Sequence, residues 1–236
     1  MQELFAGLTL NDVHADLLRN IKTIRVTQDL YDDLSSDSRD WQTAIAAELA
    51  VKPEFATPTI IERPFDEILY FDSIEFPFKN WMESRYSDGH FGVWYSAEKL
   101  ETTIYETVHH WRRLLDASEG FNQYEHPIIG ERRVFRVRCD AALLDFLPRI
   151  ADFPSLIAPN DYSYTQEVGR RVHREGQPGI LTRSARCDGK VFAIFRKEVL
   201  SNPRNYCDLT YKLIPASGKV TVERQVGTIM MTLKKP

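Results

Sequence analysis

An arginine, a tyrosine and a glutamate lie within the stretch SRYSDGHFGVWYSAEKLETTIYETVHHW, residues 84–111, and their types and spacing could support chemistry. Arg85 precedes a glycine-containing turn, Tyr95 ends a predicted strand, and Glu106 lies on the helix predicted after it. Arginine suits bidentate binding of phosphate or carboxylate. A tyrosine ring offers a flat stacking surface, and a glutamate can bond a ribose hydroxyl or stabilise a cationic sugar transition state. Together these properties fit a nucleotide with a reactive glycosidic bond.

The same three residues also have an ordinary structural interpretation. Most arginines are solvated, and most tyrosines in strands pack in a core. Glu106 falls opposite the apolar stripe of its helix, beside Thr102, His109 and Arg113, so helical periodicity predicts that it is exposed. Residue types and spacing alone therefore favour the plain surface of a strand and a helix.

Length and composition set the class of protein. The chain has 236 residues, 43% hydrophobic and 27% charged, which suits one large domain or one domain with a small appendage. A net charge of −4 predicts no direct binding of nucleic acid and no general attraction to anionic membranes. Three cysteines without a C-x-x-C pair favour a reducing compartment and argue against a zinc site or a disulfide framework. With no signal peptide and no membrane-length apolar run, the sequence predicts a cytoplasmic protein.

The first part of the chain is predicted to be helical. Residues 1–55 carry apolar side chains near helical spacing at Leu10, Val13, Leu17, Leu18, Ile21 and Ile24. Pro53, Pro58 and Pro64 then interrupt the pattern, because proline removes a backbone donor and disfavours helix in the residue before it. We therefore expect a helical N-terminal extension over residues 1–57 and a second region over residues 58–236.

The second region is predicted to be strand-rich with inserted helices, an α+β fold. Aromatic, β-branched or alternating runs predict strands at 68–78, 91–96, 131–140, 179–185, 190–195 and three more within 212–233. Residues 97–118 predict a helix capped by Ser96, with an apolar stripe of Leu100, Ile104, Val108, Trp111 and Leu115. Residues 161–176 predict a second helix that ends at Gly176.

Several of these features together resemble the RES-domain toxins. That family has an arginine followed by an aromatic residue and a glycine turn, a Tyr-x-Ala strand end, a helix bearing a glutamate, then a second helix, a Ser-Ala segment and an Asn-Pro pair. The matching positions here are Arg85, Tyr86, Gly92, Tyr95, Ala97, Glu106, Ser184, Asn202 and Pro203. The resemblance covers about residues 60–236 and makes residues 58–236 the expected RES domain.

The resemblance implies an ADP-ribosyltransferase-like core and a toxin that degrades NAD+ by hydrolysis or phosphorolysis, with NAD+ as substrate rather than a permanently bound cofactor. It also implies a Xre-type antitoxin as partner. By the same resemblance Arg85 would grip the diphosphate or ribose of NAD+, and Tyr95 would stack at the nicotinamide end. Glu106 would stabilise the oxocarbenium-like charge, and Ser184 would position a ribose or the nicotinamide. Arg63, 22 residues before Arg85, matches an early family arginine, although a proline follows it where an aromatic residue is usual.

Two other functions remain open at this point: an ADP-ribosyltransferase acting on a protein or nucleic acid, and a non-catalytic binding module. The choice between water and inorganic phosphate as acceptor, the oligomeric state, the antitoxin surface and the role of residues 1–57 are also left open. No metal site is predicted, because the adjacent His109 and His110 diverge by about 100° on a helix. The helix could place one of them at a cleft wall, and solvent is the simpler expectation for both. Cys139 is predicted to be a buried thiol.

Overall fold

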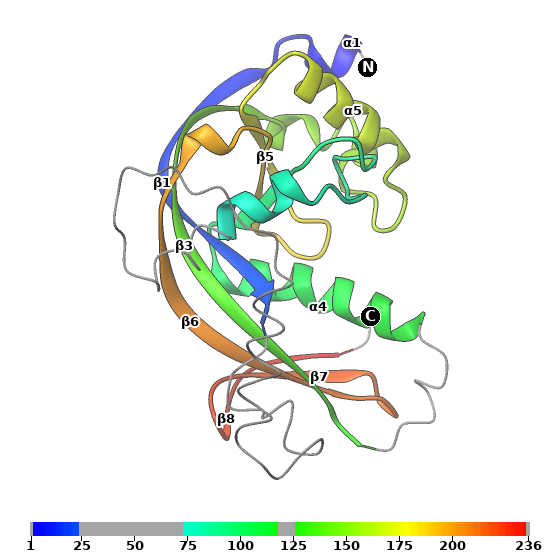
Figure 1. The fold of residues 1–236 in the computed structure, drawn as a ribbon. Helices are drawn as coiled ribbons and strands as arrows, with labels where there is room; N and C mark the ends of the chain where they lie inside the picture. Colours follow the sequence, from blue (N-terminus) through cyan, green and yellow to red (C-terminus); the bar gives the residue numbers. More distant parts are fainter. Residues whose placement is uncertain (1, 24–72, 118–125, 235–236) are drawn as a thin grey trace.

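The computed structural model describes residues 2–23, 73–117 and 126–234, and these form a curved sheet with helices on its concave side (Figure 1). The strands are β1 (Thr9–Lys22), β2 (Trp94–Ala97), β3 (Ile128–Asp145), β4 (Gly179–Arg183), β5 (Lys190–Ile194), β6 (Leu200–Ile214), β7 (Lys219–Gln225) and β8 (Thr228–Leu233). The helices are α1 (Gln2–Phe5), α4 (Leu100–Asp116) and α5 (Ser163–Arg174), and residues 73–79 are also helical. Short 3-10 turns occur at η2 (Leu147–Arg149), η3 (Pro154–Ile157) and η4 (Lys197–Val199). The predicted α+β, strand-rich class is confirmed.

The strand order is β1-β2-β5-β4-β3-β6-β7-β8, and β1 additionally pairs with β3. The long strands β1, β3 and β6 run side by side along the convex edge of the molecule in Figure 1. The short strands β2, β5 and β4 pair with one another and join the long strands at two places. β2 pairs with β1 at Leu18↔Ala97, and β4 pairs with β3 at Leu144↔Ile180. Among the described helices none is both long and apolar enough to cross a membrane.

The predicted helix at the start of the chain is wrong for residues 9–22. Residues 9–22 form β1, which pairs antiparallel with β3 from Thr9↔Asp145 to Lys22↔Arg132. Val13 and Leu17, four residues apart, face one buried cluster, and a spacing of four satisfies both the helical period and the strand period. Leu18 packs in a different cluster on the opposite face, because both faces of the sheet are covered there. The boundary at residue 57, the helix predicted for residues 24–55 and Arg63 lie outside the described residues.

A second correction concerns the strand predicted at residues 68–78. Residues 73–79 form a helix, in which Ile74 and Phe78 pack four residues apart against the same core cluster. In this segment the apolar and aromatic residues form the buried face of a helix and not a strand. Each later predicted strand has a counterpart among β2 to β8, but β3 extends beyond the predicted residues 131–140 and most of β6, before residue 212, was not predicted. In α5, Gly176 follows the helix at φ 71, the left-handed conformation that glycine adopts readily.

The helix that carries Glu106 is α4, and its predicted stripe is confirmed. Leu100, Ile104 and Val108 are buried against β6, β7 and β8, while Trp111 and Leu115 are partly buried on the same cluster. Its predicted cap is wrong, since Ser96 lies in β2 and the helix begins after Lys99 without a side-chain cap. Packing of the apolar stripe therefore positions this helix, with no contribution from a capping side chain.

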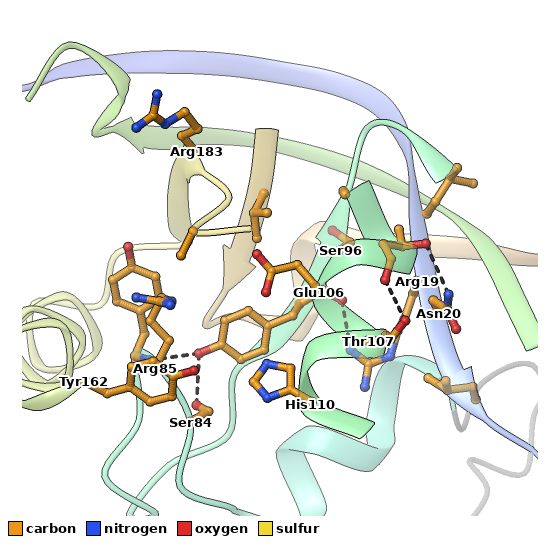
Figure 2. Close-up of a pocket in the computed structure, with 18 of the residues that line it drawn as sticks. Arg19, Asn20, Ser84, Arg85, Ser96, Glu106, Thr107, His110, Tyr162 and Arg183 are labelled. Atoms are coloured by element: carbon orange, nitrogen blue, oxygen red, sulfur yellow. Dashed lines mark hydrogen bonds between the residues drawn. The ribbon is translucent and has the colours of Figure 1, made fainter. Parts of the chain in front are cut away.

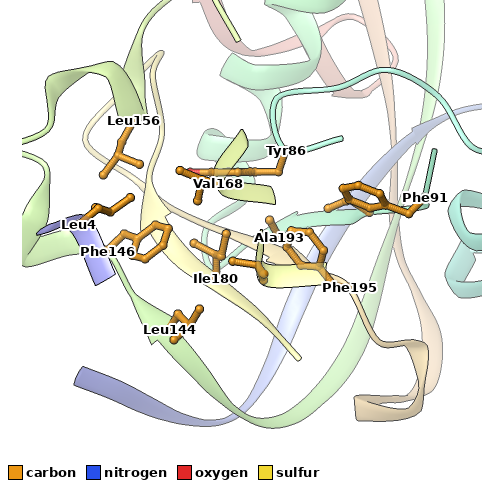
Figure 3. Close-up of a cluster of buried hydrophobic side chains, with 12 residues drawn as sticks. Leu4, Tyr86, Phe91, Leu144, Phe146, Leu156, Val168, Ile180, Ala193 and Phe195 are labelled. Carbon is orange, nitrogen blue, oxygen red and sulfur yellow. The ribbon is translucent and has the colours of Figure 1, made fainter. Parts of the chain in front are cut away.

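Helix α5 packs closely on the chain segment that carries Arg85. Its Val168 and Val172 share a buried cluster with Tyr86, Ile180 and others (Figure 3). Gly169 permits the approach, because a Cβ built at this position would lie 1.8 Å from the Tyr86 carbonyl oxygen. The backbone next to Arg85 is therefore fixed by a helix–backbone contact that needs a residue without a side chain.

We expect the substitution Gly169→Ala to destabilise the protein by about 1–3 kcal/mol, because the added methyl group forces α5 away from the Tyr86 backbone. This loss outweighs the gain of up to about 1 kcal/mol from the better helix propensity of alanine. Urea unfolding followed by circular dichroism measures the change. Glu167→Ala, at an exposed position of the same helix, should stay within about 0.5 kcal/mol of the wild type. Equal midpoints for the wild type and Gly169→Ala would show that the helix can shift at no cost.

Candidate functional site

A cavity of about 450 Å³ opens between β1, the loop at residues 83–86, β2, α4 and the segment after β4 (Figure 2). Its size lies within the range of small-molecule sites, roughly 300–1,000 Å³. We call it the cleft. Arg85, Tyr95 and Glu106 all line it, so the structure brings these three predicted residues together from a loop, a strand and a helix. Their roles in catalysis stay a prediction.

Glu106 is held in place by the fourth predicted residue, Ser184. The Ser184 hydroxyl, 4% exposed, donates a hydrogen bond of 2.5 Å to Glu106 Oε1. Ser184 Oγ in turn accepts hydrogen bonds from the backbone N–H groups of Arg186 at 2.9 Å and Cys187 at 3.3 Å, which fixes the orientation of the hydroxyl. A carboxylate bonded in this way is already oriented, so it loses less conformational entropy on binding a ligand than a freely rotating side chain would.

The prediction that Glu106 lies on an exposed helix face is wrong, and the loop after β4 explains why. Gly189 of that loop sits against Thr102, so that a Cβ at this glycine would lie 1.9 Å from Thr102 Oγ1. Thr102 is accordingly only 3% exposed, and Glu106 is half-buried. A segment about 80 residues later in the chain covers the polar side of α4.

Tyr95 uses its hydroxyl inside the protein. The oxygen accepts from the Tyr86 backbone N–H at 2.9 Å and shares a hydrogen bond of 2.9 Å with the Ser84 hydroxyl. Burial raises the pKa of the Tyr95 phenol above its usual value, so the group stays neutral at physiological pH. Tyr95 thus ties β2 to the residues on either side of Arg85, and its ring is the part left for a ligand.

Arg85 is anchored on the side of its guanidinium that faces the segment after β3. Nη1 donates to the Ala158 carbonyl oxygen at 2.9 Å and, more weakly, to that of Leu156 at 3.5 Å. The guanidinium lies 4.5 Å from the ring centroid of Tyr162, another residue that lines the cleft. Nη2 is buried and has no hydrogen-bond partner in the part of the chain that the structure describes.

The sequence did not point to Arg19, which lines the cleft from β1. Its Nη1 donates to the Tyr95 carbonyl oxygen at 3.1 Å, and its guanidinium lies 5.4 Å from the Trp94 ring centroid. Burial lowers its pKa to about 10, which still leaves it charged at pH 7. Because residues 9–22 were predicted to be a separate helix, no sequence signal placed this arginine beside Tyr95. Asn20, next to it, bonds Thr103 and Tyr211 and also lines the cleft.

His110 and Arg113 also line the cleft, four and seven residues after Glu106 on α4. This spacing puts all three on one face of a helix, a signal that the sequence contained. The sequence placed the two histidines in solvent or one of them at a cleft wall, and His110 is both exposed and part of the cleft lining. Burial lowers the pKa of the neighbouring His109 to about 4, so that its ring is neutral at pH 7. Asn202 and Pro203 lie in β6 at a register shift opposite β3 and do not line the cleft.

The cleft is positively charged. Its lining includes the guanidinium groups of Arg19, Arg85, Arg113 and Arg183 against the carboxylates of Glu83 and Glu106. An excess of arginines in a concave site favours a ligand with several negative charges. Glu106 lies between the groups around Arg85 and Arg19 in Figure 2, where it can meet a positively charged part of the same ligand.

Other reactive groups lie outside this arrangement. All three cysteines are free, and Cys139 is buried as predicted, with its pKa raised to about 11 by desolvation, so that it is a protonated thiol. Among residues 2–23, 73–117 and 126–234 no group of histidine, cysteine and acidic side chains could hold a metal ion.

Fold and cleft together define an α+β protein in which a curved sheet carries an arginine-rich cleft around one serine-held carboxylate. The chain belongs to the RES domain family, whose model matches residues 66–214. Among solved structures, it is similar to the crystal structure of the M. tuberculosis MbcT–MbcA toxin–antitoxin complex, with 13% sequence identity, a TM-score of 0.49, and coverage of 91% of this chain and 92% of that chain. No curated protein matches the chain in sequence.

Proposed function

We propose that the protein is the toxin of a type II toxin–antitoxin pair and that it degrades NAD+ by cleaving the nicotinamide–ribose bond. The observation that carries the proposal is the position of Glu106, bonded to buried Ser184 at 2.5 Å in the same cleft as Arg85 and Tyr95. Membership of the RES family supports the same activity. The ADP-ribosyltransferase-like description of the core remains a prediction from the resemblance.

The charges of the cleft match those of the proposed substrate. The diphosphate of NAD+ is anionic and suits Arg85 and the other arginines, whereas the nicotinamide ring and its ribose carry the positive charge and suit the side of Glu106. Orientation and one fixed carboxylate are the main requirements, because nicotinamide is already a cationic leaving group.

The proposed reaction follows from these positions. As the bond between the ribose C1 atom and the nicotinamide nitrogen breaks, nicotinamide takes the electron pair and leaves as a neutral molecule. The oxocarbenium-like charge that develops on the ribose is stabilised by the Glu106 carboxylate. An oxygen of water or of inorganic phosphate then bonds to C1, and its proton is released to solvent. Ser184 holds Glu106 at the start and does not itself take part in bond making.

The experiment that tests the function is incubation of the purified protein with NAD+ in buffers with and without inorganic phosphate, followed by analysis of the products. Nicotinamide with ADP-ribose indicates hydrolysis, and nicotinamide with a phosphate ester of ADP-ribose indicates phosphorolysis. Release of nicotinamide only after addition of a protein or nucleic acid would indicate a transferase instead. Intact NAD+ under all of these conditions would refute the proposal.

An enzyme that depletes NAD+ needs an inhibitor in its own host cell. We therefore propose a Xre-type antitoxin as the partner, in keeping with the family, and expect it to cover the cleft. Co-expression with that antitoxin should restore growth of cells that produce the active protein. Growth arrest in the presence of the partner would contradict the pairing.

Ser184→Ala should lower kcat for NAD+ cleavage by about ten-fold or more, because a hydrogen bond to a charged group contributes about 1.5–3 kcal/mol. Without that bond the Glu106 carboxylate is free to rotate away from the substrate. Steady-state kinetics measure the change. The matched control is Ser201→Ala, at an exposed position in β6, which should leave the kinetics unchanged. An unaltered kcat in Ser184→Ala would show that the serine does not orient the carboxylate.

A further inference from the structure

The segment from Leu156 to Tyr162 contacts two arginines, Arg85 in the lining of the cleft and Arg186 in the segment after β4. It accepts hydrogen bonds from Arg85 at the Ala158 carbonyl oxygen, 2.9 Å away, and from Arg186 at the Pro159 carbonyl oxygen. Tyr162 ends the segment and contacts both: its ring centroid lies 4.5 Å from the Arg85 guanidinium, and its hydroxyl accepts from Arg186 Nη2 at 3.3 Å.

Arg186 connects this segment to the carboxylate. Its backbone N–H donates to Ser184 Oγ at 2.9 Å, and that hydroxyl in turn donates to Glu106. Tyr162 thus contacts both Arg85, which lines the cleft, and Arg186, whose backbone helps to fix Ser184 and through it Glu106. In Figure 2, Tyr162 and Arg85 lie together on the side of the cleft away from Arg19.

These contacts restrict the Arg85 side chain before any ligand binds. A free arginine loses about 1.5–2 kcal/mol of rotamer entropy when it is fixed. Here the two carbonyl oxygens hold Nη1 and the tyrosine ring holds the guanidinium plane, while Nη2 has no partner among the described residues. A side chain held in this way binds an anion with a smaller entropic loss.

We propose that Tyr162 is a positioning residue, which holds the Arg85 guanidinium in the orientation that binds the phosphate groups of the ligand. The proposal rests on the proposed function, in which Arg85 binds the diphosphate of NAD+. Tyr162 acts on substrate affinity through Arg85 and leaves the bond-breaking step to Glu106.

The test uses ADP as a diphosphate probe, with its Kd measured by calorimetry, together with KM and kcat for NAD+. Tyr162→Leu should raise the Kd for ADP and the KM for NAD+ by about ten-fold, because the guanidinium loses its stacking partner, and kcat should change less than about three-fold. Tyr162→Phe keeps the ring and should restore both affinities to within about three-fold. Equal losses in the leucine and phenylalanine variants, or a loss confined to kcat, would overturn the proposal.

A double-mutant cycle shows whether Tyr162 acts through Arg85. In the Arg85→Ala background, Tyr162→Leu should change the Kd for ADP less than about two-fold, whereas a further ten-fold loss would refute the coupling. Thermal melts verify that each variant folds, and Tyr162→Gln carries the same expectation should the leucine variant unfold. If the variants show this coupling with ADP while the wild-type protein leaves NAD+ intact, the proposed function is refuted and the positioning role is supported. NAD+ cleavage without coupling would do the opposite.

Discussion

Glu106→Gln is expected to lower kcat for NAD+ cleavage by roughly 1,000-fold, the largest effect of any single substitution in this protein. The glutamine has the same shape and keeps an oxygen that can accept the Ser184 hydrogen bond, so the change removes the negative charge and little else. Loss of one preorganised electrostatic group in an active site costs about 100- to 1,000-fold in rate, and the Glu106 carboxylate is the full charge that faces the ribose in the proposed mechanism. Loss of NAD+ followed by chromatography measures the rate.

Glu101→Gln is the matched control, because it makes the same chemical change at an exposed position in the first turn of the same helix and does not line the cleft. It should cleave NAD+ at the wild-type rate. Both variants should melt within a few degrees of the wild type, since neither residue packs in the core. Glu106→Gln with a turnover within a few-fold of the wild type would exclude Glu106 from the role assigned to it.

The sequence predicted α4 from a local pattern, whereas the meeting of its glutamate with Tyr95 was an expectation from the family resemblance. A stripe of apolar residues at helical spacing places Leu100, Ile104 and Val108 on one side of the helix, and the structure agrees. The surroundings of Glu106 on the other side were not predictable in this way. They depend on Ser184 and Gly189, which reach α4 only when the segment after β4 folds over it.

The error at β1 had a direct effect on the site. Val13 and Leu17 are compatible with a helix and with a strand, and only the partner strand β3 decides between the two. Since β3 begins more than 100 residues after β1, a local pattern carries no information about the pairing. Arg19 was therefore missed, although it lies against Trp94 and bonds to the backbone of Tyr95.

Tyr95 gives a further example of what sequence cannot show. The residue type predicted a ring for stacking and gave no account of the hydroxyl. In the structure the hydroxyl holds Ser84 and the Tyr86 backbone, and thereby positions Arg85 between them. Sequence patterns named the residues that meet in the cleft, whereas the division between binding a ligand and supporting a neighbour follows from three-dimensional contacts.

Arg85→Ala is expected to raise the KM for NAD+ by about 30-fold or more while kcat falls much less. The guanidinium is placed to bind the anionic part of the substrate, and charge-assisted hydrogen bonds of this kind contribute about 1.5–3 kcal/mol, or somewhat more when they are bidentate. The same contact is present in the bound substrate and in the transition state, so its loss affects binding more than the chemical step. Initial rates over a wide range of NAD+ concentrations separate the two parameters.

Arg85→Lys and Arg174→Ala give this prediction its contrast. The lysine keeps the positive charge but has no planar fork to bond the Ala158 carbonyl while stacking on Tyr162, so its KM should fall between those of the wild type and Arg85→Ala. Arg174 is exposed on α5 and does not line the cleft. Its removal should leave KM unchanged, because salt screens the attraction between a distant exposed charge and the substrate. A KM that stays at the wild-type value in Arg85→Ala would mean that the phosphates bind elsewhere in the cleft, where Arg19, Arg113 and Arg183 are the other arginines of the lining. Lowered kcat at constant KM would instead place Arg85 beside the departing nicotinamide, and the orientation of the dinucleotide in the cleft would be reversed.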